Sequence, residues 1–193
     1  MGITGGVGSG KSRVLEILKE EYGFRVIQAD QVAKDLMQPG QESYQAVVDF
    51  LGPSILNEDG TINRPAMAQV IFGCPDKRIQ VDRLTHPLVW NTAFGEALAC
   101  PEPLVVIEAA IPSKEFRDNC GEMWYVYTSR ENRMERLRES RGYTQEKTES
   151  IMDSQAPDAG FSEFSDAVID NNGSVEDTRK QIRRLLKNKI RMQ

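Results

Sequence analysis

The sequence predicts an α/β fold in which a five-stranded parallel sheet is flanked by helices, and two observations support this prediction. Five short apolar runs rich in β-branched residues alternate with longer segments of helical periodicity. The octapeptide GGVGSGKS at residues 5–12 separates the first apolar run from the first helical segment. Because a phosphate-binding loop of this pattern joins a strand to a helix, the motif and the alternation predict the same architecture.

The order of the elements follows from local patterns along the chain. The expected strands are the apolar, β-branched runs at residues 3–4, 25–29, 104–109, 123–128 and 167–170. The expected helices follow the 3.6-residue apolar period and cover residues 12–22, 31–37, 43–51, 65–72, 75–99, 131–140 and 144–154. A last helix is predicted by the apolar stripe Ile182, Leu185, Leu186 and Ile190.

Two intervals between strands are too long for a single crossover helix. The first, about residues 31–100, holds four helical patterns and predicts a helical substrate-binding insertion. The second, about residues 130–165, holds two strongly charged helices and predicts a mobile lid. The rest, about residues 1–30, 101–129 and 166–193, is the expected core, so residues 1–193 are expected to form one domain.

Composition limits the classes of protein to which the chain can belong. No apolar run approaches the ~20 residues that span a bilayer and no secretory signal precedes the first strand, so we expect a cytoplasmic protein without a membrane partner. Cys74, Cys100 and Cys120 are far apart, as expected for reduced thiols. The net charge of −5 argues against a nucleic-acid partner.

Basic residues nevertheless gather near the C-terminus, where residues 178–193 contain seven of them and no acidic residue. This segment fits an RNA or membrane contact. The apolar stripe within it favours a simpler interpretation, the exposed face of the last helix with cations near its C-terminal end.

The octapeptide contains the residue types that binding of nucleotide phosphates requires. Glycine allows backbone conformations that a Cβ forbids, so that N–H groups can wrap around a phosphate. Lys11 is expected on the β- and γ-phosphates, and Ser12 on Mg²⁺, at the positive end of the following helix. The alternative is a glycine-rich turn that matches the pattern by chance, and the flanking strand and helix argue against it.

Two carboxylates follow or close predicted strands. Asp30 follows the second strand, where it could orient and deprotonate an attacking hydroxyl; the alternative is the N-cap of a helix that starts at Gln31. Glu108 closes the third strand, where an acidic residue could hold Mg²⁺ or its waters; the alternative is an ordinary acid at a strand end.

Basic residues of the two insertions are further candidates. The predicted lid contains Arg130, Arg133, Arg136, Arg138 and Arg141. One or two are expected to reach a transferring phosphoryl group on lid closure, with Arg141 beside Gly142 as the first candidate. Most of the others are expected to be solvated and paired with Glu131, Glu135 and Glu139.

The first insertion contains the only histidine, His86, next to Pro87. It is either a residue at the helix irregularity that this proline creates or a ligand contact. Arg64 and Arg83 lie in the same insertion, and either pair with substrate phosphates or with acids such as Asp82.

Several segments, taken together and in order, resemble the dephospho-CoA kinase family. They are GITGGVGSGKS, VIQAD followed by VAKDLMQPG, LGPSIL, EDGTINR, VIF, the RLTHPLV segment around His86, Arg136-Leu137 with Arg141, Ser154-Gln155, and DAVIDNNG at residues 166–173. Each of them is weak alone. Together they are specific, because other phosphate-loop kinases share only the first.

The resemblance implies a P-loop kinase that uses ATP and Mg²⁺ to phosphorylate the ribose 3′-hydroxyl of dephospho-CoA, the last step in making coenzyme A. The catalytic residues would be Asp30, Lys11 and Arg141. The nucleotide contacts would be Gly5, Gly6, Val7, Gly8, Ser9, Gly10, Lys11, Ser12, Arg13 and Asn171, the last near adenine. The substrate contacts would be Asp30, Arg64, Arg83 and His86, and the metal ligands Ser12 and Glu108. We expect a monomer or a weak homo-oligomer.

The chain departs from the family pattern at a few positions. Arg13 stands where a hydroxyl residue usually follows Ser12, and Gln28 replaces the first Asp of a DAD element. Asp30 is therefore the only carboxylate left in that element.

Two other functions fit part of the sequence. Another small-molecule kinase, for a nucleoside or a sugar acid, would use the same core, but the long helical insertion and the His-Pro element argue against it. A GTP-dependent switch would explain DxxG at residues 118–121 and 170–173. Neither follows the expected strand in order, and residues 188–191 fail the Asn-Lys-x-Asp guanine pattern at its last place.

Overall fold

A five-stranded parallel sheet organises the protein, as the sequence predicted. The computed structural model describes residues 1–190, with side chains through Lys187. The strands are β1 (Gly2–Thr4), β2 (Arg25–Gln28), β3 (Val105–Ala109), β4 (Met123–Tyr127) and β5 (Ala167–Asp170), in the order β2-β3-β1-β4-β5. The register pairs Ile3 with Glu108 and with Trp124, so β1 lies at the centre.

The helices agree closely with the apolar periodicity. They are α1 (Lys11–Tyr22), α2 (Ala29–Leu36), α3 (Glu42–Leu51), η1 (Pro53–Ile55), α4 (Arg64–Phe72), α5 (Pro75–Ala99), α6 (Lys114–Asp118), α7 (Arg130–Arg141), α8 (Gln145–Asp153), α9 (Asp158–Glu163) and α10 (Val175–Ile190). The sequence did not predict η1, α6 and α9, because helices of three to six residues are too short to show a period.

The chain divides into two compact units. The first combines Met1–Val26 with the chain from Cys100 onward, and the second is Ile27–Ala99. The second unit has nearly the bounds of the predicted insertion, whereas the predicted lid belongs to the first unit.

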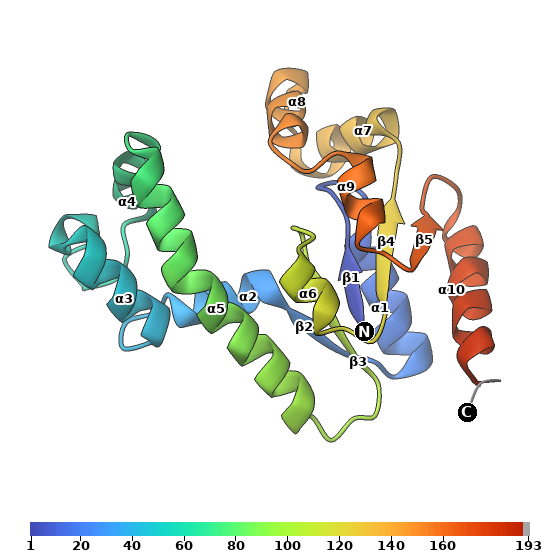
Figure 1. Ribbon diagram of the computed structural model, residues 1–193. Helices are drawn as coiled ribbons and strands as arrows, with labels where there is room; N and C mark the ends of the chain where they lie inside the picture. Colours follow the sequence, from blue (N-terminus) through green and yellow to red (C-terminus); the bar gives the residue numbers. More distant parts are fainter. Residues whose placement is uncertain (191–193) are drawn as a thin grey trace. The chain divides into compact units, whose positions relative to one another are not determined.

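The first unit packs helices on both faces of the sheet (Figure 1). On one face, Ile3, Val106, Trp124, Val126 and Ile169 of the strands form a core with Val14, Leu15, Ile17 and Leu18 of α1 and Ile182 of α10. The opposite face meets α6 and α9. There Gly2 leaves room for Phe116, Cys120 and Met123, since a Cβ at this position would collide with all three. Each fully buried large apolar side chain contributes about 2 kcal/mol.

The last helix has the amphipathic character that its sequence indicated. Ile182 is buried and Leu185 is half-buried, whereas Arg183 and Arg184 are exposed. Ile190, Lys189 and Arg191 lie outside the residues whose side chains the structure describes.

The second unit is built around α5. Helices α2, α3 and α4 pack against α5, and Val47, Ile55 and Val81 form the centre of a small core. The irregularity expected at Pro87 does not interrupt α5, which runs from Pro75 to Ala99. Val89 and Ala93, two and six residues beyond the proline, are buried, and this packing offsets the lost backbone hydrogen bond. Within residues 1–190, no helix is both long and apolar enough to span a membrane.

Tyr125 joins β4 to α9 in the first unit. Its hydroxyl donates to the Asp158 carboxylate at 2.6 Å, and its ring stacks on Phe161 with centroids 5.1 Å apart. Burial raises the pKa of Tyr125, and the hydrogen bond to Asp158 raises it further.

Replacing Tyr125 by Phe is expected to lower the free energy of unfolding at pH 7 by about 1 kcal/mol, because one buried hydrogen bond is lost. The raised folded-state pKa means that the tyrosine contributes its full stability below about pH 10 and loses it as the pH rises further. The variant should therefore lose stability less steeply than the wild type between pH 9 and about pH 11. Urea unfolding across this range tests the expectation, with Tyr127→Phe as control; equal slopes for wild type and Tyr125→Phe would contradict it.

Candidate functional site

Residues 5–10 leave β1 and enter α1 as a loop with several backbone donors that are unpaired in the described chain. Gly8 and Gly10 have φ angles of 77° and 85°, which side chains rarely tolerate. Gly10 is the N-cap of α1 and provides no side-chain cap. Within residues 1–190, the N–H groups of Gly8, Gly10 and Ser12 have no hydrogen-bond partner. A helix N-terminus with unpaired N–H groups is suited to bind a phosphate.

The Lys11 side chain folds back onto the start of this loop. Its Nζ donates to the Gly5 carbonyl at 2.6 Å and lies 3.5 Å from Oε1 of Glu108. Both side chains are largely buried, at 14% and 8% exposure. Glu108 faces the loop because β3 is the neighbour of β1. The structure therefore makes Glu108 an ion-pair partner of the loop lysine, which is more than an ordinary acid at a strand end.

The Ser9 carbonyl collects three donors from the far side of the loop. It accepts from Thr128 Oγ1 at 2.9 Å, from Asn171 Nδ2 at 2.8 Å and from Arg136 Nη1 at 3.4 Å. Asn171 is buried, and its Oδ1 accepts from Thr178 at 2.8 Å. The Asn171 amide thus binds the loop through Nδ2 and α10 through Oδ1, and a contact with adenine stays a prediction.

Two arginines of the predicted lid, Arg133 and Arg136, bind the loop and do not pair with the lid glutamates as expected. Arg133 is 8% exposed and donates through Nε to the Val7 carbonyl at 2.8 Å. Arg136 donates through Nη2 to the Asn171 carbonyl at 2.7 Å. Burial lowers the pKa of the Arg133 guanidinium, while Tyr125 and Asp158 act in the opposite direction.

The remaining lid arginines point elsewhere. Arg130 pairs with Asp153 at 2.9 Å, and Arg138 pairs with Glu135 at 3.5 Å, which is the only expected glutamate pairing found in the described part of the lid. Arg141 is exposed and its guanidinium lies 5.9 Å from the centre of the Tyr143 ring. The structure does not bring Arg141 to the loop, and its action on a phosphoryl group stays a prediction.

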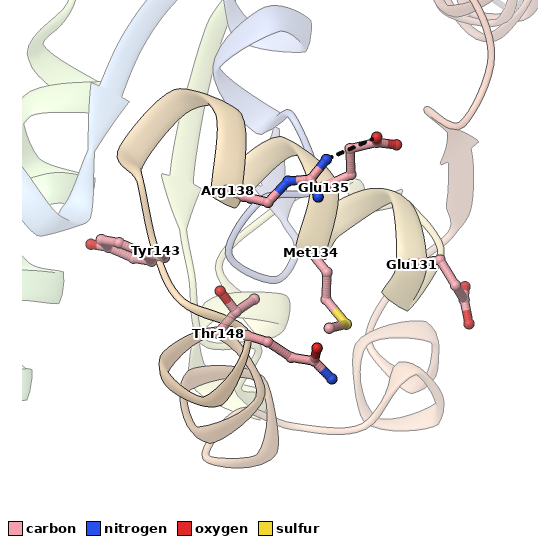
Figure 2. Close-up of a pocket in the computed structure, with 7 residues that line it drawn as sticks. Glu131, Met134, Glu135, Arg138, Tyr143 and Thr148 are labelled. Atoms are coloured by element: carbon pink, nitrogen blue, oxygen red, sulfur yellow. Dashed lines mark hydrogen bonds and ion pairs between the residues drawn. The ribbon is translucent and has the colours of Figure 1, made fainter.

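The other face of α7 borders a hollow within the predicted lid segment. Figure 2 shows it between α7 and α8; its volume is about 320 Å³ and it is lined by Glu131, Met134, Glu135, Arg138, Tyr143, Gln145 and Thr148. The lining residues of α7 recur every three or four positions and therefore share one face. Arg133 and Leu137 lie on the other face, which packs against the loop at Gly6 and Gly8.

The start of α1 carries the last two loop candidates. Ser12 is exposed in its first turn. Arg13 is also exposed, and its Nη1 lies 2.5 Å from Oε2 of Glu16. The structure therefore gives Arg13 a partner on the outer face of α1, and a nucleotide contact by Arg13 stays a prediction.

The candidates of the second unit are exposed. Asp30 is the second residue of α2, so the proposed N-cap role is wrong: the helix begins at Ala29 with Gln28 as its cap residue. His86 lies 3.9 Å from Asp82. Arg64 and Arg83 make no ion pair within the described chain.

Sequence reasoning missed Thr128 and Gln155, and it missed the loop contact of Arg133. Thr128 had a usable signal, since it follows β4 at the carboxyl end of the sheet. The only signal for Gln155 was that it belongs to Ser154-Gln155, one of the segments that resemble the family. Arg133 had no such signal, because nothing in the sequence distinguishes it from the other arginines of the same charged helix.

Comparison with known proteins agrees with this geometry. A family model described as dephospho-CoA kinase matches residues 1–177. A dephospho-CoA kinase of Streptococcus mutans is 36% identical over 185 residues, which is 94% of this chain and 93% of that protein. A solved structure from Thermus thermophilus has a TM-score of 0.80 at 24% identity and covers 97% of this chain and 95% of its own. A dephospho-CoA kinase structure from Campylobacter jejuni has a TM-score of 0.69 at 18% identity, with coverage of 96% and 94%; these two structures show the shared fold.

Proposed function

The chain belongs to the dephospho-CoA kinase family, and on this premise we propose that it transfers the γ-phosphoryl group of ATP to the ribose 3′-hydroxyl of dephospho-CoA. The product is coenzyme A, so the reaction is the last step of its synthesis. The observation that carries the proposal is the loop at residues 5–12, in which backbone donors and the Lys11 ammonium converge at the start of α1.

Binding of ATP is proposed to use the phosphate loop and two side-chain oxygens that could hold Mg²⁺. Lys11 would leave the Gly5 carbonyl and bind the β- and γ-phosphates, while the N–H groups of Gly8, Gly10 and Ser12 bind their oxygens. Mg²⁺ prefers oxygen ligands and takes one or two from protein in nucleotide sites. The Ser12 hydroxyl and the Glu108 carboxylate fit this donor set, directly or through water. When bound, the ion would neutralise charge on the phosphates.

Asp30 is proposed as the base. Its exposed carboxylate is not used as a helix cap, which leaves it available to accept the proton of the 3′-hydroxyl. The hydroxyl oxygen then bonds to the γ-phosphorus as the bond from that phosphorus to the β-phosphate oxygen breaks, and ADP leaves. The proton stays on Asp30 until solvent removes it.

The second unit is proposed to bind dephospho-CoA. Its exposed basic side chains include Arg64, Arg83 and His86, and the two arginines have no ion-pair partner among the described residues. Cations of this kind suit the diphosphate of the substrate.

Arg141 is proposed to reach the transferring phosphoryl group when the lid closes, since its guanidinium is exposed and makes no ion pair within the described residues.

We further propose a cytoplasmic enzyme that acts as a monomer or a weak homo-oligomer and binds no nucleic acid. The net charge of −5 supports the last point, because it would repel a phosphate backbone.

The proposed function is tested by incubating the protein with Mg²⁺, ATP and dephospho-CoA and analysing the products by mass spectrometry. We expect ADP and 3′-phosphorylated product in equal amounts. Parallel reactions with a nucleoside, with gluconate and with GTP in place of ATP serve as comparisons. Turnover of a nucleoside or gluconate without turnover of dephospho-CoA would replace the proposal by another small-molecule kinase, and a strict preference for GTP would contradict ATP as donor.

A further inference from the structure

Two lid side chains bind both backbone groups of Val7, in the middle of the phosphate loop. The Val7 N–H donates to Oε1 of Gln155 at 3.0 Å, and the Val7 carbonyl accepts from Nε of Arg133 at 2.8 Å. Arg133 also donates through Nη2 to the same Gln155 oxygen at 2.8 Å. The three hydrogen bonds close a ring in which Gln155 Oε1 receives two donors.

The two side chains come from opposite ends of the α7–α8 segment. Arg133 lies in the first turns of α7, and Gln155 follows α8, which ends at Asp153. Gln155 is itself held in place, since its N–H donates to the Met152 carbonyl at 3.1 Å. The start of α7 and the residue that follows α8 therefore contact the same loop residue, Val7.

The loop needs such support because of its composition. Four of its eight residues are glycines, and glycine loses more conformational freedom on ordering than any other residue. Arg133 also lies directly over Gly6, where a Cβ would collide with the guanidinium. A loop already held in its binding shape does not have to be ordered when the nucleotide binds, so its affinity is higher.

We propose that Gln155 is a positioning residue of the phosphate loop. Through Oε1 it holds the Val7 N–H and the Arg133 guanidinium together, and thereby keeps the loop in its phosphate-binding shape before nucleotide arrives. The proposal rests on the proposed function only in that the loop binds nucleotide phosphates. Gln155 itself contacts neither phosphate nor the reacting atoms.

The test replaces Gln155 by Leu, which keeps the volume and removes the acceptor. We expect the Kd for ATP, measured by calorimetry without dephospho-CoA, to rise by about tenfold, because two hydrogen bonds are lost, one of them to a charged group. In turnover assays the KM for ATP should rise similarly, with the KM for dephospho-CoA unchanged and kcat within about threefold of the wild type. A residue with only a structural role would lower thermal stability without separating the two KM values.

Gln145→Leu is the matched control, because it makes the same change at the start of α8, in the hollow away from the loop. Its side chain donates to Glu149, and the variant should bind ATP as the wild type does. Gln155→Asn, which keeps the amide but shortens it by one methylene, covers the case in which Gln155→Leu does not fold. It should weaken ATP binding in the same direction.

A double-mutant cycle with Arg133→Met tests the shared oxygen. Because both side chains meet at one atom, the double variant should lose clearly less affinity for ATP than the product of the two single losses. Independent losses, or an unchanged Kd for ATP in both Gln155→Leu and Gln155→Asn, would overturn the inference. The proposed reaction fails separately, since absence of coenzyme A formation by the wild type leaves the ATP-binding measurements interpretable.

Discussion

Replacing Asp30 by Asn is expected to lower kcat by about a hundredfold or more, as loss of a general base commonly does, while the affinity for ATP stays close to the wild type. Asparagine keeps the size of the side chain but cannot accept the 3′-hydroxyl proton. Asp30 lies outside the phosphate loop, so the substitution leaves the residues that are proposed to bind ATP unchanged. The measurements are steady-state kinetics with dephospho-CoA and calorimetric binding of ATP.

Asp35→Asn provides the control for Asp30. Asp35 is also exposed on α2 and bonds to Gln31 at 2.8 Å, so the same chemical change is made on the same helix. Loss of a negative charge in the first turn of α2 costs only about 0.3–1 kcal/mol of stability, so Asp30→Asn should remain folded. A kcat near that of the wild type would exclude Asp30 as the base and would leave it only the role of a stabilising negative charge in the first turn of α2.

Replacing Lys11 by Ala is expected to weaken ATP binding and to lower kcat by about a hundredfold or more, because the lysine is proposed to bind the phosphates and to stabilise charge that develops during transfer. The same change removes a cation 3.5 Å from the buried Glu108 carboxylate, which costs some stability as well. Calorimetry, turnover and thermal unfolding of the variant measure the three effects.

Lys19→Ala is the control for Lys11, since Lys19 is exposed in the last turn of the same helix. It should leave ATP binding and kcat unchanged. If Lys11→Ala lowered kcat but left the affinity for ATP intact, the ground-state contact with the phosphates would be excluded. If it changed only thermal stability, Lys11 would serve the Glu108 ion pair alone.

Much of the fold could be read from local patterns. The run at residues 123–128 is rich in apolar and aromatic residues, as a strand buried on both faces requires, and the structure shows this strand at Met123–Tyr127. The 3.6-residue period placed α5 at its observed bounds. The same reasoning failed for α9, whose six residues are stabilised by the contact of Phe161 with Tyr125 and by no period of their own.

The site was predicted less evenly than the fold. The octapeptide identified the loop, because steric freedom at glycine and the charge of Lys11 are local properties. The function of Glu108 stayed open in the sequence. An acidic residue at the end of a strand gives the same local pattern whether or not Lys11, which follows a different strand, lies next to it. The register of β1 with β3 answers part of that question by bringing Lys11 within 3.5 Å.

By itself the sequence determined the order of the strands and of the longer helices, the phosphate loop and the family, all of which depend on residues near one another in the chain or on their order. Only the tertiary structure decided which side chains support the loop. Gln155 is 148 residues from Val7, and Asn171 is 162 residues from Ser9. The physical reason is that a hydrogen bond needs two groups within about 3 Å in the right orientation. Chain folding sets that distance, and the residue types alone do not encode it.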